Sequence, residues 1–104
     1  MNDQTKTRIE DLLKSHSLFL FMKGTPEAPM CGFSARAIAI LGELKIPYGT
    51  FNVLEDAEIR EGIKAFGNWP TIPQLYFKNE LVGGSDIMME MFQAGELQEL
   101  VAQN

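Results

Sequence analysis

Hydrophobic side chains recur along the chain at two spacings, one typical of helices and one typical of strands. Helical spacing marks four stretches, residues 5–15, 32–44, 55–67 and 85–104. Each stretch is predicted to form an amphipathic helix that packs one face against a core. We expect Gly67 at the C′ position of the third helix, Ser85 or Asp86 as the cap of the fourth, and Gly95 as its interruption.

Shorter apolar stretches between these helices predict four strands. Residues 18–22, LFLFM, form a continuous apolar run, which is consistent with a strand buried at the centre of a sheet. Residues 48–53 carry the anchors of a second strand, and residues 69–84 are predicted to form a β-hairpin with its turn at residues 78–80. Residues 23–30 contain one glycine and two prolines and are a predicted loop.

The order of these elements, α-β-α-β-α-β-β-α, indicates a three-layer α/β fold. A βαβ half followed by a helix and a hairpin suggests one mixed sheet with helices on both faces. The 104 residues suit one domain with one core, and no linker, repeat or low-complexity tract divides them. We therefore expect residues 1–104 to form a single domain.

Composition and charge argue against several functional classes. The formal net charge is −5 and the nine Lys and Arg residues are scattered, whereas a nucleic-acid-binding protein usually has a basic stripe. No apolar stretch is long enough to cross a bilayer, and the first residues do not resemble a secretory signal. A single cysteine argues against a disulfide-stapled secreted protein. We expect a cytoplasmic protein that binds neither nucleic acid nor membrane.

The single cysteine lies where a helix should begin. Cys31 directly precedes the predicted helix 32–44, so unpaired N–H groups and the positive end of the helix dipole should face its sulfur. That environment favours the thiolate, which is both the nucleophile and the metal ligand. Lys23 would add a positive charge, and Gly32 would let a ligand approach closely. The alternative is a structural cysteine packed in the core.

Counting sulfur atoms limits what this thiol can do. The third residue after Cys31 is Ser34 rather than a second cysteine, so any disulfide must join Cys31 to another molecule. A [2Fe–2S] cluster needs four ligands, normally thiolates. One chain supplies one and a dimer supplies two. The others would have to come from elsewhere, such as a small-molecule thiol.

Three motifs occur in order along the chain: FMKGTPEAPMCGFS at residues 21–34, WPTIPQLY at 69–76 and LVGGSD at 81–86. With these motifs the chain resembles the monothiol glutaredoxins of the CGFS class over essentially its whole length. The resemblance implies the thioredoxin-like (glutaredoxin) three-layer fold, in which helices flank a mixed four-stranded sheet. It also implies a groove that binds glutathione.

The resemblance assigns residues of this chain to the groove. Lys23 and Arg60 would contact the glycine carboxylate of glutathione, and Asp86 would contact its ammonium group. The complete set of implied glutathione contacts is Lys23, Arg60, Thr71, Ile72, Pro73, Gly84, Ser85 and Asp86. Taken singly, Lys23, Arg60 and Asp86 also have ordinary explanations, as a solvated lysine, a helix ion pair and a helix cap.

Backbone groups take part in the implied groove as well. Thr71 and Ile72 would pair through their main chain with the cysteinyl residue of glutathione, because a cis bond at Pro73 turns the preceding backbone toward a ligand. The helix start at Ser85 would receive the γ-glutamyl carboxylate. Trp69 is expected to be a structural anchor beside the groove.

The resemblance finally implies three candidate functions. Cys31 would be the active-site thiolate and also a cluster ligand. In a cluster-bound homodimer, two Cys31 thiolates and two glutathiones would hold one [2Fe–2S] cluster for transfer to apo iron–sulfur acceptor proteins. The alternative function is that of a glutathione-dependent monothiol oxidoreductase that removes glutathione from proteins. A third hypothesis is a binding module with a BolA-type partner. Many relatives have a cysteine at the position of Ser85, and its absence here excludes an intramolecular disulfide.

Overall fold

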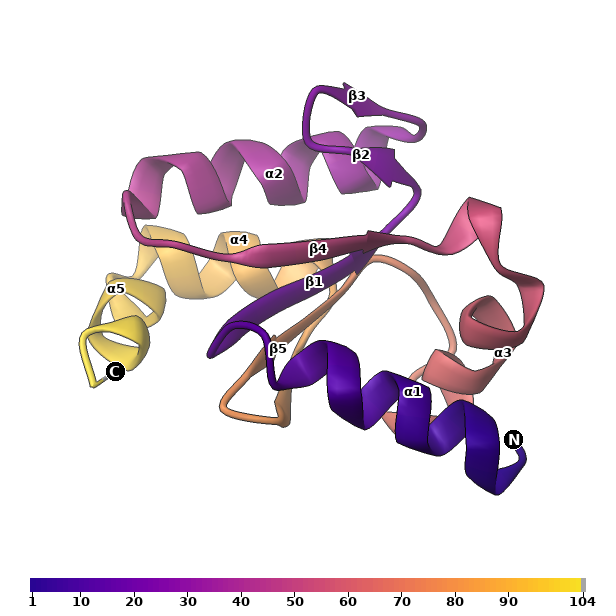
Figure 1. Ribbon diagram of the computed structural model, residues 1–104. Coiled ribbons are helices and arrows are strands. Elements are labelled where there is room, and N and C mark those ends of the chain that lie inside the picture. The colour runs from indigo at the N-terminus through magenta and orange to yellow at the C-terminus, as the bar shows by residue number, and fades with distance from the viewer. Residues whose placement is uncertain (104) are drawn as a thin grey trace.

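The centre of the molecule is a mixed sheet of four strands, shown in Figure 1 for the computed structural model, which describes residues 1–103. The strands are β1 (Leu18–Met22), β4 (Gly49–Asn52), β5 (Gln74–Phe77) and β6 (Glu80–Gly83). Their order is β4-β1-β5-β6, with β4 parallel to β1, and with β5 and β6 antiparallel to their neighbours. The predicted mixed four-stranded sheet is therefore confirmed.

Helices cover both faces of this sheet and complete three layers (Figure 1). One face carries α2 (Gly32–Leu44), α4 (Ser85–Gln93) and α5 (Glu96–Val101). The other face carries α1 (Asp3–Leu13) and α3 (Ala57–Phe66). The helices form because each has an apolar stripe that the sheet can bury.

Strand β1 separates the two halves of the core. Leu18, Leu20 and Met22 belong to the core between the sheet and helices α2 and α4. Phe19 and Phe21 belong to the core between the sheet and helices α1 and α3. This division follows from the two-residue period of a strand. All five side chains are buried, so the prediction of a central strand is confirmed.

The segment between β1 and α2 differs from the predicted loop because it contains a small hairpin. Its strands are β2 (Gly24–Thr25) and β3 (Ala28–Pro29). Gly24 has φ 93°, and a Cβ there would collide with the backbone of Ala28 and Met30. Its amide donates to Oδ1 of Asn52 at 2.9 Å, which ties the hairpin to the end of β4.

Several predicted boundaries were wrong for local reasons. Helix α1 begins at Asp3 rather than residue 5, because Oδ1 of Asn2 caps it by accepting the amide of Thr5 at 2.8 Å. Strand β4 ends at Asn52, whose side chain accepts the amide of Leu54 and starts a 3-10 turn, η1 (Val53–Glu55). In the β5–β6 hairpin only residues 78 and 79 form the turn, both with positive φ, and residue 80 already belongs to β6.

Helix ends near the predicted groove also differ from expectation. Gly67 is the C-cap of α3, one position before the predicted C′, and its backbone is right-handed. The left-handed residue is the next one, Asn68 (φ 50°). Gly84, rather than Ser85 or Asp86, is the N-cap of α4. Gly95 separates α4 from α5 with φ 77°, as predicted. Helix α5 ends at residue 101, and the prediction for residue 104 lies outside the described residues.

The helices are short. Within residues 1–103, none is both long enough and apolar enough to cross a membrane.

Candidate functional site

Cys31 is the N-cap residue of α2, where the sequence placed it. Its backbone is extended, and its Sγ accepts a hydrogen bond from the amide of Ser34 at 3.3 Å. The sulfur therefore lies at the positive end of the α2 dipole. The side chain is free of any disulfide and partly exposed, which contradicts the alternative of a cysteine packed in the core.

Ser34 connects this thiol to the end of β1. Its buried Oγ lies 3.4 Å from Sγ of Cys31 and accepts the amide of Lys23 at 3.0 Å. The neutral thiol can donate to this oxygen. Once the sulfur is a thiolate, the hydroxyl turns its own proton toward the sulfur, because the Lys23 amide can only donate. In the sequence, Ser34 was notable only as the absence of a second cysteine, and this role was missed.

The pKa of the Cys31 thiol reflects opposing influences. Partial burial, the largest of them, raises the pKa. The Ser34 hydroxyl, the amides of Ser34 and Phe33, and the charge of Lys23 all lower it. Together the lowering influences outweigh burial, so the pKa lies below its ordinary value and the thiolate is favoured.

A pocket of about 400 Å³ lies between the start of α2, helix α3 and the start of α4. Its lining includes all eight predicted glutathione residues: Lys23, Arg60, Thr71, Ile72, Pro73, Gly84, Ser85 and Asp86. Cys31 is not among the described residues that line it. Phe33 and Lys23 are, and they place the thiol at the edge of the pocket. The structure thus brings the predicted residues together, while their individual contacts with glutathione stay predictions.

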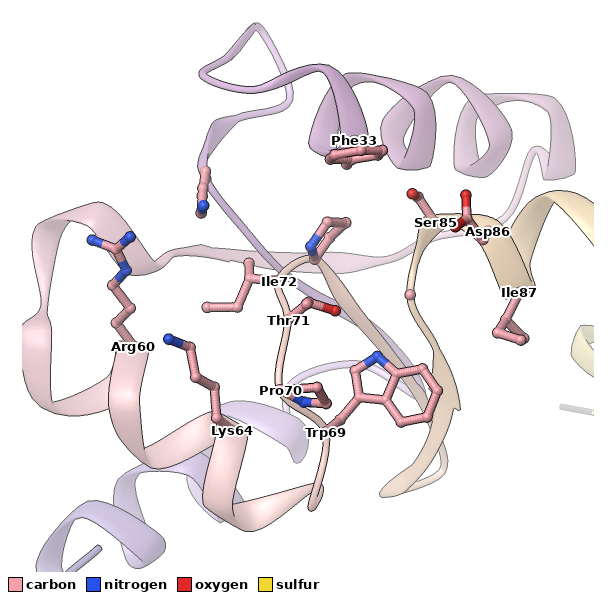
Figure 2. Close-up of a pocket in the computed structure, with 13 residues that line it drawn as sticks. Phe33, Arg60, Lys64, Trp69, Pro70, Thr71, Ile72, Ser85, Asp86 and Ile87 are labelled. Atoms are coloured by element: carbon pink, nitrogen blue, oxygen red, sulfur yellow. The ribbon is translucent and has the colours of Figure 1, made fainter.

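Opposite charges occupy the two ends of the pocket. Figure 2 shows the nitrogen atoms of Arg60 and Lys64, both on α3, at one end. Ser85 and Asp86, at the start of α4, lie at the other end. A ligand with a carboxylate at one end and an ammonium group at the other would match this arrangement.

The loop of residues 69–73 crosses the pocket between these ends (Figure 2). The Ile72–Pro73 peptide bond is cis, as the sequence motif predicted. In the part of the chain that the structure describes, neither the amide nor the carbonyl of Ile72 has a hydrogen-bond partner. These groups are therefore available to a ligand.

Comparison with known proteins identifies the family. The profile of the glutaredoxin family matches residues 18–82. The chain belongs to the glutaredoxin family. It is 55% identical over 101 residues to a Synechocystis protein named "Uncharacterized monothiol glutaredoxin ycf64-like", covering 97% of this chain and 94% of that protein. It is 52% identical to monothiol glutaredoxin-S17 of Arabidopsis thaliana over 93% of this chain, but it spans only 20% of that longer protein.

A solved structure agrees with this assignment. The solution structure of reduced poplar apo GrxS14 superposes with a TM-score of 0.84 at 45% identity, covering 94% of this chain and 90% of that one. The thioredoxin-like glutaredoxin fold is therefore confirmed. With one cysteine and monothiol relatives, the chain is a monothiol glutaredoxin, a family that uses glutathione.

The pocket of this glutaredoxin also contains residues that sequence analysis did not assign to it. They are Phe33, Lys64, Trp69, Pro70 and Ile87. Lys64 had a detectable signal, because it follows Arg60 by four residues and so lies on the same face of α3. Trp69 was expected only beside the groove. Its indole N–H is buried without a partner among residues 1–103.

The start of α4 is arranged differently from the predicted capping. The first amides of a helix have no partner within the helix, and here no side chain of the described residues caps them, so they can bind an anion. The carboxylate of Asp86 accepts a hydrogen bond from Arg36 on α2 at 3.2 Å, and the Asp86 side chain is 83% exposed. This ion pair between α2 and α4 was not predicted from the sequence.

The chain by itself offers little to a metal. Residues 1–103 contain no group of three or more His, Cys, Asp or Glu side chains placed to hold a metal ion. The only thiolate that one chain can offer is that of Cys31. One thiolate can take part in binding a [2Fe–2S] cluster only if other molecules supply the remaining sulfur ligands.

Proposed function

We propose that this monothiol glutaredoxin carries a [2Fe–2S] cluster between two copies of itself and transfers the cluster to apo iron–sulfur proteins. The observation that carries the proposal is a single, partly exposed, activated thiol at the edge of a pocket with charged ends. No second cysteine is available to close an internal disulfide. The thiol must therefore work with sulfur atoms of other molecules.

Glutathione is the proposed source of those sulfur atoms. Its glycine carboxylate would lie at the end with Lys23, Arg60 and Lys64. Its γ-glutamyl carboxylate would meet the uncapped start of α4, and its ammonium group would meet Asp86. The free backbone groups of Ile72 would pair with the cysteinyl residue, whose sulfur would then lie toward Cys31 at the edge of the pocket.

Two copies with one glutathione each would supply four sulfur ligands, two from Cys31 and two from glutathione. Each glutathione would be bound to the protein through non-covalent contacts alone, so the glutathione sulfurs would be exchangeable ligands of the iron. Thiols of an acceptor protein can then replace them one at a time, which suits a carrier. We propose in addition that residues 1–104 act as one domain in the cytoplasm, and that a BolA-type protein can take the place of the second copy.

A second candidate function is supported by the lowered pKa of Cys31. The thiolate would attack the glutathione sulfur of a glutathionylated protein and release the protein thiolate, leaving a disulfide between Cys31 and glutathione. A second glutathione would then attack that disulfide, forming oxidised glutathione and restoring the Cys31 thiol. This external step is required because the chain has no resolving cysteine.

Anaerobic reconstitution with iron, sulfide and glutathione tests the carrier proposal. We expect the wild-type chain to become a coloured dimer. When an apo acceptor is added and the two proteins are then separated, the colour should be found on the acceptor. Cys31→Ser should stay a colourless monomer. A colourless wild-type monomer, or a cluster retained by Cys31→Ser, would contradict the proposal. Turnover of a glutathionylated peptide with excess glutathione tests the second function separately, and it should depend on Cys31.

A further inference from the structure

A buried side-chain amide, outside the residues assigned to glutathione, is bonded to two residues that line the pocket. Gln74 is the first residue of β5 and is fully buried. Its Nε2 donates to the carbonyl of Trp69 at 3.0 Å and to the carbonyl of Thr71 at 3.2 Å. Its Oε1 accepts the hydroxyl of Tyr76 at 2.8 Å. Both donors and the acceptor are therefore used.

The orientation of this amide follows from its partners. Two of them are backbone carbonyls, which can only accept, so the nitrogen of Gln74 must face the loop. Tyr76 is buried, and burial raises the pKa of its phenol. It therefore remains a neutral donor toward Oε1. The ring of Tyr76 is held by an edge contact with Phe21, with 5.7 Å between the ring centroids.

Gly67 leaves room for this arrangement. A Cβ at residue 67 would collide with the Tyr76 hydroxyl and would lie 3.0 Å from Oε1 of Gln74. The requirement for glycine here comes from the buried network, since the backbone of Gly67 is right-handed. Tyr76 and the two loop carbonyls therefore hold the amide in place, and Gly67 leaves the space that they need.

The two carbonyls that Gln74 binds belong to the loop of residues 69–73, which crosses the pocket. The amide of Trp69 bonds to the carbonyl of Lys64 at 3.0 Å. Beyond that bond, residues 70–73 make no backbone–backbone hydrogen bond within the described chain. The side chain of Gln74 is thus the main polar anchor of the loop.

These contacts decide which backbone groups of the loop keep a free hydrogen-bonding capacity. The carbonyl of Thr71 already accepts a hydrogen bond from Gln74, so of the two backbone groups of Thr71 only the amide has no partner among residues 1–103. Both backbone groups of Ile72 lack a partner within the described chain, and a residue that pairs with a strand-like ligand uses its amide and its carbonyl together. We propose that Gln74 is a positioning residue that holds the loop so that Ile72, and not Thr71, pairs with the cysteinyl backbone of glutathione. The inference rests on the proposed glutathione-dependent function and narrows the predicted pairing from two residues to one.

The test compares Gln74→Met with Tyr76→Phe in the full chain. Methionine has nearly the size of glutamine but makes neither loop bond, whereas Tyr76→Phe keeps both loop bonds and removes only the bond to Oε1. Reduced glutathione is titrated anaerobically, and affinity is measured by calorimetry below the melting temperature of each variant. The backbone amide signal of Ile72 is followed by NMR.

We expect Gln74→Met to bind glutathione about tenfold more weakly, because two anchoring bonds are lost. We also expect the response of the Ile72 amide to shrink in this variant. Tyr76→Phe should be less stable than wild type but bind within about twofold of it. A purely structural role of Gln74 would lower the stability of both variants and leave both affinities unchanged.

Wild-type affinity in folded Gln74→Met, or equal weakening in both variants, would overturn the inference. If Gln74→Met does not fold, the wild-type chain gives the answer. The side-chain NH2 signals of Gln74 should shift and exchange more slowly with water when glutathione binds, and unchanged signals would overturn the inference. Glutathione affinity and the NMR signals are measured on protein without a cluster. A failed cluster reconstitution would therefore refute the carrier function and leave this result unaffected.

Discussion

Replacing Ser34 with alanine tests how the fold activates the thiol. The Ser34 hydroxyl lies 3.4 Å from Sγ of Cys31 and is held there by the amide of Lys23. Alanine removes the hydroxyl but leaves the first amides of α2 and the charge of Lys23 in place. Because the hydroxyl lowers the pKa of Cys31, we expect that pKa to rise in Ser34→Ala.

The size of this rise can be worked from the geometry. A hydrogen bond to a charged group contributes roughly 1.5–3 kcal/mol. The lower end applies here, because the S···O distance is 3.4 Å and the thiol is partly exposed. One pKa unit corresponds to about 1.4 kcal/mol, so the pKa should rise by about one unit. The Lys23 amide also loses its acceptor, which should lower the free energy of unfolding by about 1–2 kcal/mol.

The lowered pKa also determines how stability changes with pH. Between the folded pKa of Cys31 and the unfolded value of about 8.5, the unfolded chain binds more protons than the folded one. The free energy of unfolding therefore rises with pH across this window. This increase in the free energy of unfolding is complete above the pKa of the unfolded chain and is lost as the pH falls through the pKa of the folded protein. In Ser34→Ala the window is narrower, so this rise should be smaller.

Two assays measure the thiol pKa in folded protein: the ultraviolet absorbance of the thiolate and the rate of alkylation, each followed against pH. Urea unfolding at several pH values measures the stability effect. Ser15→Ala is a matched control, because its hydroxyl donates to the carbonyl of Leu12 at the end of α1. An unchanged pKa in folded Ser34→Ala would refute the proposed role of the hydroxyl. An equal shift in Ser15→Ala would refute it as well.

Two further substitutions test the pocket and its support. Lys64→Met should weaken glutathione binding a few-fold and reduce its salt dependence, because one of three cations is lost. Lys14→Met is the control, since it breaks a similar exposed ion pair on α1, and an equal effect there would contradict the reasoning. Gly67→Ala should lower the free energy of unfolding by about 1–3 kcal/mol, because its Cβ meets Tyr76. Thermal unfolding measures this, and unchanged stability would disprove the collision.

Local signals in the sequence predicted much of the fold. The apolar run LFLFM predicted β1, and helical periodicity predicted α2 with Cys31 at its start. Such signals work because the burial pattern of a strand or helix repeats over a few neighbouring residues. Boundaries were less accurate where a single side chain decided them, as Asn2 does for α1 and Asn52 does for the end of β4.

The motifs also named eight pocket residues, but they could not describe how those residues are held. Asp86 pairs with Arg36, fifty residues earlier in the chain. Gly67 was interpreted as a helix-end signal, whereas its lack of a Cβ makes room for Tyr76. These contacts join positions whose separation in sequence says nothing about their distance in space.

By itself, the sequence determined that this chain has one thiol, that a helix begins at that thiol, and that any disulfide of this thiol must join it to another molecule. Only the tertiary structure decided how the thiol is activated and which backbone groups of the pocket loop are left without a hydrogen-bond partner. Ser34 reaches the amide of Lys23, and Gln74 turns the carbonyl of Thr71 inward. Hydrogen bonds of this kind depend on distances of a few tenths of an ångström, which only the packing of helices against the sheet can establish.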